Sequence, residues 1–431
     1  MKKALLVNPW IYDFKAFDFF LKPLGLLYLA SYLRKFNFQI SFLDCLDRYH
    51  PFLSEGKKPK VDSFGRGKFI SRFIPKPVIY QNIPRRYKRY GLPIEDLERT
   101  LNEIERPDYI FLTSIMTYWY PGVIATITLL RKYFPKTPII LGGIYATLCF
   151  SHAQKFSGAD LVISGPFETE LYKYLPGLKP IPFSELPFPA YDLYKKLDYV
   201  SILTSRGCPF RCTYCAVPRL FPEFQFRKKE EVIAEIDYYR ELGIKNIAFT
   251  DDALLCHPEI KTLLKELAKK NWPINFHTPN GLHPRFLDRE IAHLLFSANF
   301  KTVYLSLETA SPSLQKRTGD KVRTEEFIRA VQFLREAGFD KEIHTYLIFG
   351  LPEQTLSDIK ESIDLVLSLG IKCHLAEFSP IPGTEEYKKI GFDEKTDPLY
   401  HNNTALFYLT KKEEFLKMKT YLQQRDRSIS S

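Results

Sequence analysis

Cysteine is scarce in this chain of 431 residues, which contains seven, an odd number. Secreted domains stabilised by disulfides are small and rich in cysteine, so a disulfide framework is not expected here. The apolar part of residues 1–9 is too short for a secretory signal and is typical of a first strand. These features together predict a protein of the reducing cytoplasm.

Long uninterrupted apolar runs are also lacking. The stretch from Ile110 to Leu130 carries no charge and is long enough to span a bilayer. Polar residues and turn formers interrupt its middle, among them Ser114, Pro121 and Gly122. The pattern predicts a strand, a loop and a helix with proline in its first turn. We therefore expect no transmembrane segment.

The net charge of +11 is distributed unevenly. A basic insert at residues 51–91 holds eleven Lys and Arg residues against only Glu55 and Asp62, and aromatic residues alternate with its charges. Such a segment could bind the phosphates of nucleic acid or of an anionic lipid surface. The alternative is an ordered arm that packs by its aromatic rings and leaves a solvated basic face. We favour the packed arm.

Residues 1–175 alternate between apolar runs typical of strands and amphipathic runs typical of helices. The expected strands are 4–8, 38–43, 109–114, 138–141 and 161–164, and the expected helices are 24–35, 94–104 and 123–133. This alternation predicts an α/β domain with a doubly wound, Rossmann-like parallel sheet, which binds ligands at the carboxyl ends of its strands. A proline-rich linker at residues 176–197 follows.

The alternation resumes after the linker with six strand-like runs and five helical patterns. The expected strands are 199–204, 245–250, 274–279, 302–308, 343–349 and 373–379, and the expected helices are 229–242, 258–270, 287–297, 323–338 and 355–369. This order predicts a partial (β/α)6 TIM-type barrel at residues 198–390, with its chemistry at the carboxyl ends of the strands. A short helical tail, 391–431, contains a charged helix from Lys411 to Arg425 that would cover the barrel.

Three cysteines lie close together after the first barrel strand. Cys208, Cys212 and Cys215 have the spacing C-x3-C-x2-C on one short loop. Three thiolates on such a loop can hold three irons of a 4Fe–4S cube and leave the fourth iron open to another ligand. A structural zinc site would need a fourth ligand, and the nearest spare pair, Cys256 and His257, lies about forty residues further on. We therefore predict an iron–sulfur cluster.

The loop strongly resembles the radical S-adenosylmethionine (SAM) superfamily, including the aromatic Tyr214 before the last cysteine. The resemblance extends from residue 2 to about residue 390 and implies SAM contacts after each barrel strand. Asp251 or Asp252 would pair with the methionyl ammonium, Glu308 would accept from the ribose hydroxyls, and Asn280 would donate to SAM or substrate. The implied cation for the SAM carboxylate is Lys316, or else Arg317. The alternatives are a helix N-cap role for Asp252, a metal site formed by Asp251 and Asp252, and a surface helix start at Lys316.

A second resemblance concerns the amino-terminal half. Ser114-Ile115-Met116 and Gly142-Gly143 follow successive strands, and glycines there let a backbone approach a ligand closely. They resemble one half of the fingerprint of the cobalamin-binding domain. The other half, D-x-H-x-x-G, is absent, because residues 10–20 contain no histidine. The implied cobalamin would therefore lack a histidine ligand to cobalt. An ordinary βα turn is the alternative.

Several further residues remain unassigned by these motifs. Cys45, Cys149, Cys256 and Cys373 lie within or after apolar runs and are expected to be small buried apolar residues. Four histidines near strand ends are candidates to face the cavity: His277, His283, His344 and His374. The sequence does not rank these histidines.

The two resemblances imply a radical SAM enzyme that cleaves SAM reductively to a 5′-deoxyadenosyl radical. The leading hypothesis is cobalamin-dependent methylation of an unactivated carbon in a small molecule or peptide. Alternatives are radical cyclisation, rearrangement or oxidation without methyl transfer, and a cobalamin or redox sensor without turnover. An electron donor such as flavodoxin or ferredoxin is implied. Methylthiolation of tRNA is disfavoured, because only Cys45 and Cys149 precede the motif.

Overall fold

The computed structural model describes residues 1–53, 60–410 and 412–430. The chain divides into two compact units, which are described separately. Unit 1 comprises Met1–Asp198 and Glu394–His401, and unit 2 comprises Tyr199–Asp393 and Asn402–Ser431. Lys57 and Lys58 of the basic insert lie outside the described residues, as does Lys411 at the start of the expected charged helix.

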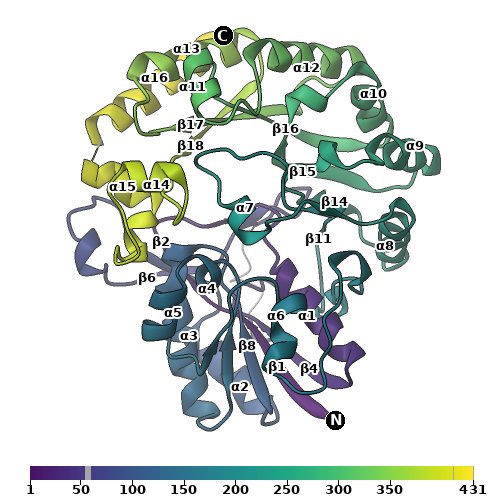
Figure 1. Ribbon diagram of the computed structural model, residues 1–431, viewed down its shortest axis with the longest axis vertical. Helices are drawn as coiled ribbons and strands as arrows, with labels where there is room; N and C mark the ends of the chain where they lie inside the picture. The colour runs from purple at the N-terminus through teal and green to yellow at the C-terminus, as the bar shows by residue number, and fades with distance from the viewer. Residues whose placement is uncertain (54–59, 411, 431) are drawn as a thin grey trace. The chain divides into compact units, whose positions relative to one another are not determined.

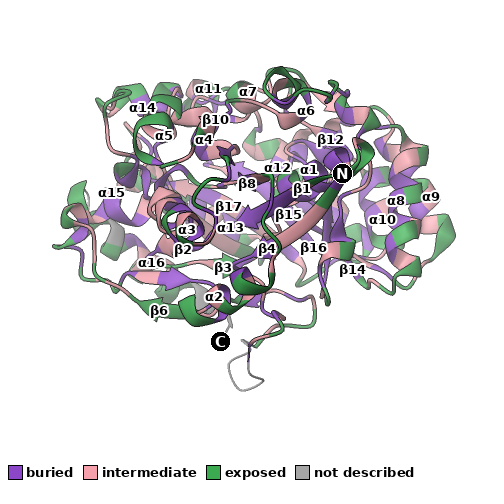
Figure 2. Ribbon diagram, turned by 90° about the horizontal axis from the view of Figure 1, so that it is seen from below, coloured by how far each residue is buried: buried purple, intermediate pink, exposed green. Residues whose placement is uncertain are grey.

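Unit 1 is built on a five-stranded parallel sheet in the order β10-β9-β8-β1-β4 (Figure 1). Its strands are β1 (Lys2–Asn8), β4 (Phe38–Asp44), β8 (Tyr109–Leu112), β9 (Ile139–Leu141) and β10 (Leu161–Val162). The central strands β1 and β8 are almost wholly buried, as expected of apolar strands covered on both faces (Figure 2). The strand order reverses between β1 and β8, and the ligand crevice of a doubly wound sheet lies at such a switch point.

Helices cover both faces of this sheet. Helix α1 (Leu24–Lys35) packs on β1 and β4 and also contacts α6 (Phe167–Glu170). Helices α2 (Ile94–Glu103) and α3 (Tyr120–Tyr133) contact each other and pack into the apolar core of the sheet. The short helices α4 (Ile144–Leu148) and α5 (Phe150–Phe156) follow β9. The predicted doubly wound α/β fold of this half is confirmed.

The basic insert is an ordered part of unit 1 wherever the structure describes it. It forms small antiparallel sheets with the segment after β1: β2 (Ile11–Asp13) pairs with β7 (Lys88–Tyr90), which pairs with β6 (Ser71–Phe73), and β3 (Phe17–Asp18) pairs with β5 (Gly67–Lys68). Four of its aromatic side chains are buried, namely Phe69, Tyr80, Tyr87 and Tyr90. Their burial supports the packed arm over a free basic stripe.

The expected linker is likewise packed against unit 1. Ser31 donates a hydrogen bond to the Phe188 carbonyl over 2.6 Å, and Tyr194 donates to Asp44 over 2.5 Å. The segment 394–401 also belongs to this unit: Tyr80 donates to the carbonyl of Leu399 over 2.6 Å. The boundary of the compact units therefore lies at residue 198, and an element near the end of the chain returns to unit 1.

Unit 2 is built on a six-stranded parallel sheet in the order β11-β14-β15-β16-β17-β18. Its strands are β11 (Val200–Ile202), β14 (Asn246–Phe249), β15 (Asn275–Leu282), β16 (Phe300–Glu308), β17 (Ile343–Phe349) and β18 (Lys372–Glu377). Strand order follows chain order, as in a (β/α) barrel, and β11 and β18 form the two edges of the described sheet. The predicted partial barrel is confirmed.

Helices connect successive strands of this sheet. They are α8 (Lys229–Glu241), α9 (Ile260–Lys270), α10 (Arg289–Ser297), α12 (Thr324–Ala337) and α13 (Leu356–Ser368), with the short α11 (Pro312–Arg317) before α12 (Figure 1). Their apolar sides are buried, as in α9, where Leu263, Leu264 and Leu267 face the core. Helices α14 (Glu385–Lys389), α15 (Asn403–Thr410) and α16 (Lys412–Ser430) complete the unit. Among the described residues, no helix is both long and apolar enough to cross a membrane.

Candidate functional site

The loop with the three cysteines begins directly after β11, at the carboxyl edge of the unit 2 sheet. Cys208 and Cys215 are half-buried, Cys212 is buried, and all three are free thiols. The backbone N–H of Val217, at the start of α7 (Val217–Leu220), lies 3.5 Å from the Cys215 sulfur and donates to it. We call residues 204–215 the cluster loop.

The thiols of the cluster loop influence one another electrostatically. Burial raises the pKa of Cys215 to about 12, and the nearby Cys212 thiol adds to this effect. Burial likewise raises the pKa of Cys208 and Cys212. The ammonium of Lys321 opposes the rise at all three sulfurs. Iron binding would therefore release protons from these thiols, and Lys321 reduces the free energy needed to do so.

The donor set fits a cluster better than a single metal ion. Within residues 1–53, 60–410 and 412–430, no three His, Cys, Asp or Glu side chains are grouped so as to hold one ion. Each cysteine of a 4Fe–4S site binds a different iron, so its ligands surround a cube rather than converge on one atom. Three thiols on one loop with a shared cation nearby suit that arrangement.

Asp251 holds the start of the cluster loop. One oxygen of this buried carboxylate accepts hydrogen bonds from the backbone N–H and hydroxyl of Thr204, at 3.0 and 2.6 Å. The same oxygen accepts from the backbone N–H and hydroxyl of Ser205, at 2.6 and 2.7 Å. Asp251 therefore anchors the start of the cluster loop. Its contact with SAM stays a prediction.

Asp252 is the second carboxylate of the predicted pair and has fewer partners. It accepts from the backbone N–H of Gly207 over 3.3 Å. Burial raises its pKa to about 7, although the Gly207 N–H opposes the rise. Asn280, predicted to contact SAM or substrate, donates its amide to the carbonyls of Thr250 and Asp251, at 2.8 and 3.2 Å. Asp252 is therefore the better candidate of the acidic pair for a ligand ammonium.

Glu308 forms an ion pair that the sequence analysis missed. It ends β16 with a φ of +67°, in the left-handed region that is rare for a residue with a side chain, and its carboxylate lies 2.5 Å from the ammonium of Lys321. The pair is largely buried, with 14% of the Glu308 side chain and 12% of the Lys321 side chain exposed. Burial alone would lower the pKa of Lys321, but attraction to Glu308, and to Cys212 when its thiol is ionised, raises it.

The cations predicted from sequence have other surroundings. Lys316 is exposed on α11. Arg317 donates to the carbonyl of Pro352 over 2.8 Å and pairs with Glu353 at 3.0 Å. The cation that lowers the pKa of the thiols is Lys321, five residues beyond Lys316. No periodic pattern or motif in the sequence distinguishes Lys321, which pairs with Glu308 at the end of β16.

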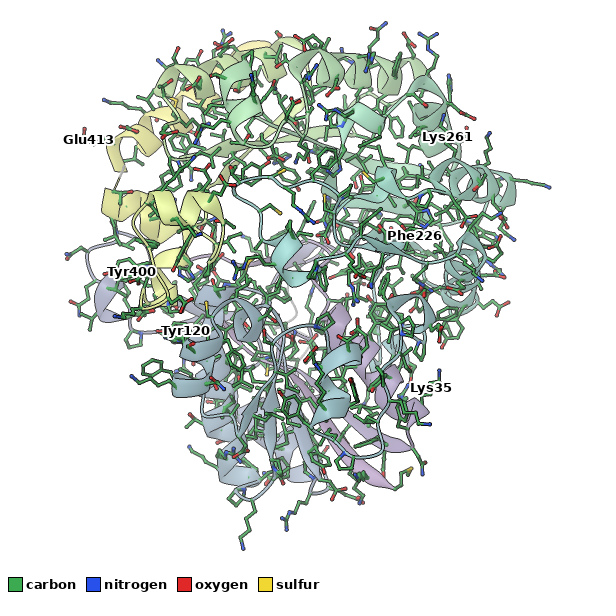
Figure 3. The ribbon with its side chains drawn as sticks, viewed as in Figure 1. Lys35, Tyr120, Phe226, Lys261, Tyr400 and Glu413 are labelled. Carbon is green, nitrogen blue, oxygen red and sulfur yellow. The ribbon has the colours of Figure 1, made fainter. Side chains whose placement is uncertain are left out.

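Neighbouring loops enclose the cluster loop. The ring of Phe210 stacks on His283, which follows β15, and the Tyr214 hydroxyl donates to the Cys212 sulfur, lowering the pKa of that thiol. Gly319 has a φ of +112°, and a Cβ there would lie 3.2 Å from the Cys212 Cα, so a side chain would displace the loop. Phe226, labelled in Figure 3, lies on β13 (Gln225–Phe226), which pairs antiparallel with Ser205 and Arg206 of the cluster loop.

Three of the four histidines predicted near strand ends differ in their burial and in their hydrogen bonds. His277 is fully buried and lies 3.0 Å from the Thr302 hydroxyl. His344 and His374 are partly exposed on β17 and β18, and their nearest ring nitrogens are 2.8 Å apart. Of the leftover cysteines, Cys45 is buried, and Cys149, Cys256 and Cys373 are half-buried.

The two sequence features proposed for cobalamin meet in unit 1. The backbone N–H of Ile144 donates to the Ser114 carbonyl over 2.9 Å, which joins the turns after β8 and β9. Gly143 has a φ of +89°, and a Cβ there would lie 2.6 Å from the Thr113 hydroxyl. A Cβ on Gly142, by contrast, would have no atom within 4 Å, and Met116 is 39% exposed. Both turns lie at the carboxyl edge of the sheet, and Ser114 follows a strand of the switch point.

Comparisons with known proteins agree with this geometry. Residues 202–366 match the family model of the radical SAM superfamily. An uncharacterized methyltransferase of Pyrococcus horikoshii is 27% identical over 214 residues, which are 46% of this chain and 45% of that protein. The chain thus spans less than half the length of this curated relative.

Solved structures share the fold across most of the chain. The radical SAM methyltransferase TsrM from Kitasatospora setae, with tryptophan and a SAM analogue bound, is 18% identical with a TM-score of 0.66, covering 90% of this chain and 76% of that chain. The cobalamin-dependent SAM radical enzyme OxsB, with aqua-cobalamin and SAM bound, is 15% identical with a TM-score of 0.58, covering 97% and 56%.

Proposed function

Since residues 202–366 form a radical SAM domain, we propose that this chain is a radical SAM enzyme that methylates an unactivated carbon with the help of cobalamin. The observation that carries the proposal is the cluster loop: three free thiols after the first barrel strand, whose pKa values the ammonium of Lys321 lowers. When bound, a 4Fe–4S cluster supplies the electron that cleaves SAM to methionine and a 5′-deoxyadenosyl radical, which removes a hydrogen atom from the substrate.

The protein's own residues would bind and orient SAM. In this proposal Cys208, Cys212 and Cys215 hold the cluster, and Asp252 receives the methionyl ammonium. Lys321 receives the methionyl carboxylate in place of Lys316, and Glu308 holds Lys321 in position. Both interactions are charge-assisted and lie in a largely buried site, where such hydrogen bonds are strongest.

The proposal of cobalamin rests on unit 1. Its strand order places a ligand crevice at the carboxyl ends of β1 and β8, and Gly142 offers open backbone beside the Ser114 turn. TsrM and OxsB, which share the fold, are described with cobalamin bound. The substrate we propose is a small molecule or peptide, because a fold does not fix a substrate. A flavodoxin or ferredoxin would supply the electron.

Anaerobic reconstitution tests the proposal. We expect about four irons and four sulfides per chain, an electron paramagnetic resonance (EPR) signal after reduction, and 5′-deoxyadenosine formation from SAM with dithionite. Cys208→Ala, Cys212→Ala and Cys215→Ala should each abolish 5′-deoxyadenosine formation, whereas the matched variant Cys256→Ala should keep it. Cobalt in stoichiometric amounts would support methyl transfer. A wild-type chain that takes up no iron–sulfur cluster would refute the proposal.

A further inference from the structure

Glu386 contacts the cluster loop with both its backbone and its side chain. It lies on α14, after the last barrel strand, and its side chain is fully buried. Its backbone N–H donates to the Thr213 carbonyl over 3.3 Å, and its carboxylate accepts from the Thr213 hydroxyl over 2.8 Å. Thr213 stands between Cys212 and Tyr214. A single residue of α14 therefore fixes the position next to a predicted cluster ligand.

Two cations compensate the buried charge of Glu386. Its carboxylate lies 3.4 Å from Arg317 and 3.3 Å from Lys389. Arg317 also donates to the Pro352 carbonyl and pairs with Glu353, both of which follow β17. The carboxylate consequently links the cluster loop to α11, which follows β16, and through Arg317 to the loop after β17.

The burial of this carboxylate has an energetic cost that a purely structural contact would avoid. Its second oxygen has no hydrogen-bond partner among the described residues, and leaving a buried polar atom unsatisfied destabilises the fold. The neighbouring Glu385 is exposed on the same helix. Thr384 already caps α14 by accepting from the Tyr387 N–H over 3.2 Å. The helix thus needs no buried acid for its own stability.

We infer that Glu386 is a positioning residue, which fixes the Cys212–Cys215 end of the cluster loop relative to the loops after β16, β17 and β18. Asp251 anchors the opposite end of the same loop through Thr204 and Ser205. The cluster loop is therefore held by one buried carboxylate at each end. This inference rests on the proposed function, because positioning the cysteines matters only if they hold a cluster.

Three variants of the full chain, reconstituted anaerobically, test the inference. Thr213→Val replaces the hydroxyl with a methyl group, Glu386→Gln keeps the size of the side chain but removes its charge, and Glu385→Gln is the matched control. We expect Thr213→Val and Glu386→Gln to lose iron to a chelator at least threefold faster than wild type. Both should also change the EPR spectrum of the reduced cluster, which a general loss of stability would not do. Glu385→Gln should match wild type in both measurements.

The double variant Thr213→Val/Glu386→Gln separates a shared contact from two independent effects. If the two residues act through their mutual hydrogen bond, it should lose iron no faster than the faster single variant. Wild-type iron loss and spectra in both single variants would overturn the inference, and so would additive effects. If Glu386→Gln does not fold, Thr213→Val decides alone. A wild-type chain without a cluster would instead refute the proposed function.

Discussion

The imidazole of His283 stacks on the ring of Phe210, with their centroids 5.0 Å apart and their planes at 14°. This contact joins the loop after β15 to the middle of the cluster loop. His283 is buried, and burial together with the charges of Lys321 and Arg285 lowers its pKa to about 3. The ring is therefore neutral at physiological pH, when it packs most favourably on Phe210.

We predict that His283 makes the stability of the protein depend on pH. Its pKa is lower in the folded than in the unfolded chain, where it is about 6.5, so its contribution is complete above pH 6.5. As the pH falls from 6.5 towards 3, the unfolded chain gains a proton that the folded chain does not. The free energy of unfolding should decrease by up to about 1.4 kcal/mol per pH unit.

Urea unfolding of His283→Phe at a series of pH values checks this expectation. The variant keeps an aromatic ring beside Phe210 but cannot take up a proton, so its stability should fall less steeply below pH 6.5. His293→Gln, at an exposed position of α10, serves as the control and should follow wild type. Equal slopes for wild type and His283→Phe would contradict the prediction.

Removing the anchor at the start of the cluster loop should destabilise unit 2. Asp251→Ala leaves the donors of Thr204 and Ser205 without their acceptor, and we expect a loss of about 3 kcal/mol or more. Asp251→Asn keeps an acceptor oxygen and should cost less. Urea unfolding measures both, with the exposed Glu241→Ala expected to stay within about 0.5 kcal/mol of wild type. A wild-type midpoint for Asp251→Ala would show that the loop does not need this carboxylate.

The role proposed for Lys321 predicts a specific loss of SAM affinity. A hydrogen bond to a charged group contributes about 1.5–3 kcal/mol, so Lys321→Met should raise the Kd for SAM by about 10- to 140-fold. The exposed Lys316→Met should leave the Kd unchanged. Lys321→Met also leaves the buried carboxylate of Glu308 without its cation. The double variant Glu308→Gln/Lys321→Met removes that unpaired charge, so it isolates the effect of Lys321 on SAM binding. Calorimetric titration of reconstituted protein with SAM would reject the role if the double variant bound SAM like wild type.

Neighbouring glycines in unit 1 allow a matched test of cobalamin binding. Gly142→Ala meets no atom within 4 Å, so the variant should fold like wild type but block close approach of a ligand to that backbone. Gly143→Ala places a Cβ 2.6 Å from the Thr113 hydroxyl and should unfold at lower temperature. Cobalt content and thermal unfolding distinguish the two variants. Full cobalamin binding by Gly142→Ala would place the ligand elsewhere.

The order of elements in both units could be predicted from the sequence, because apolar runs and helical periodicity record which side chains are buried. The expected strand 302–308 corresponds to β16, Phe300–Glu308, and the three cysteines do share one loop after β11. Partners contributed by distant loops could not be predicted. Asp251 follows β14 closely, near the predicted strand end, but the sequence does not reveal that its carboxylate accepts from the donors of Thr204 and Ser205.

The partners of Lys321 and Glu386 could not be predicted from the sequence either. Each lies in or near a short connecting segment without periodicity, and each acquires its role from a contact over many residues, with Glu308 and with Thr213. The resemblance implies Lys316, or else Arg317, for the SAM carboxylate. Lys321 follows α11 and pairs with Glu308, whereas Lys316 is exposed.

The return of residues 394–401 to unit 1 determines how this polypeptide can be divided. The chain passes between the units at residues 198–199, 393–394 and 401–402, so three covalent crossings connect them. A protease that cuts at 198–199 would leave residues 1–198 without a covalent link to the rest of the chain, held to it by the packing of residues 394–401 within unit 1. A gene fragment that starts at residue 199 would express the barrel together with residues 394–401. That segment would lack its hydrogen-bond partners in unit 1, namely Tyr80, Thr117 and Tyr120.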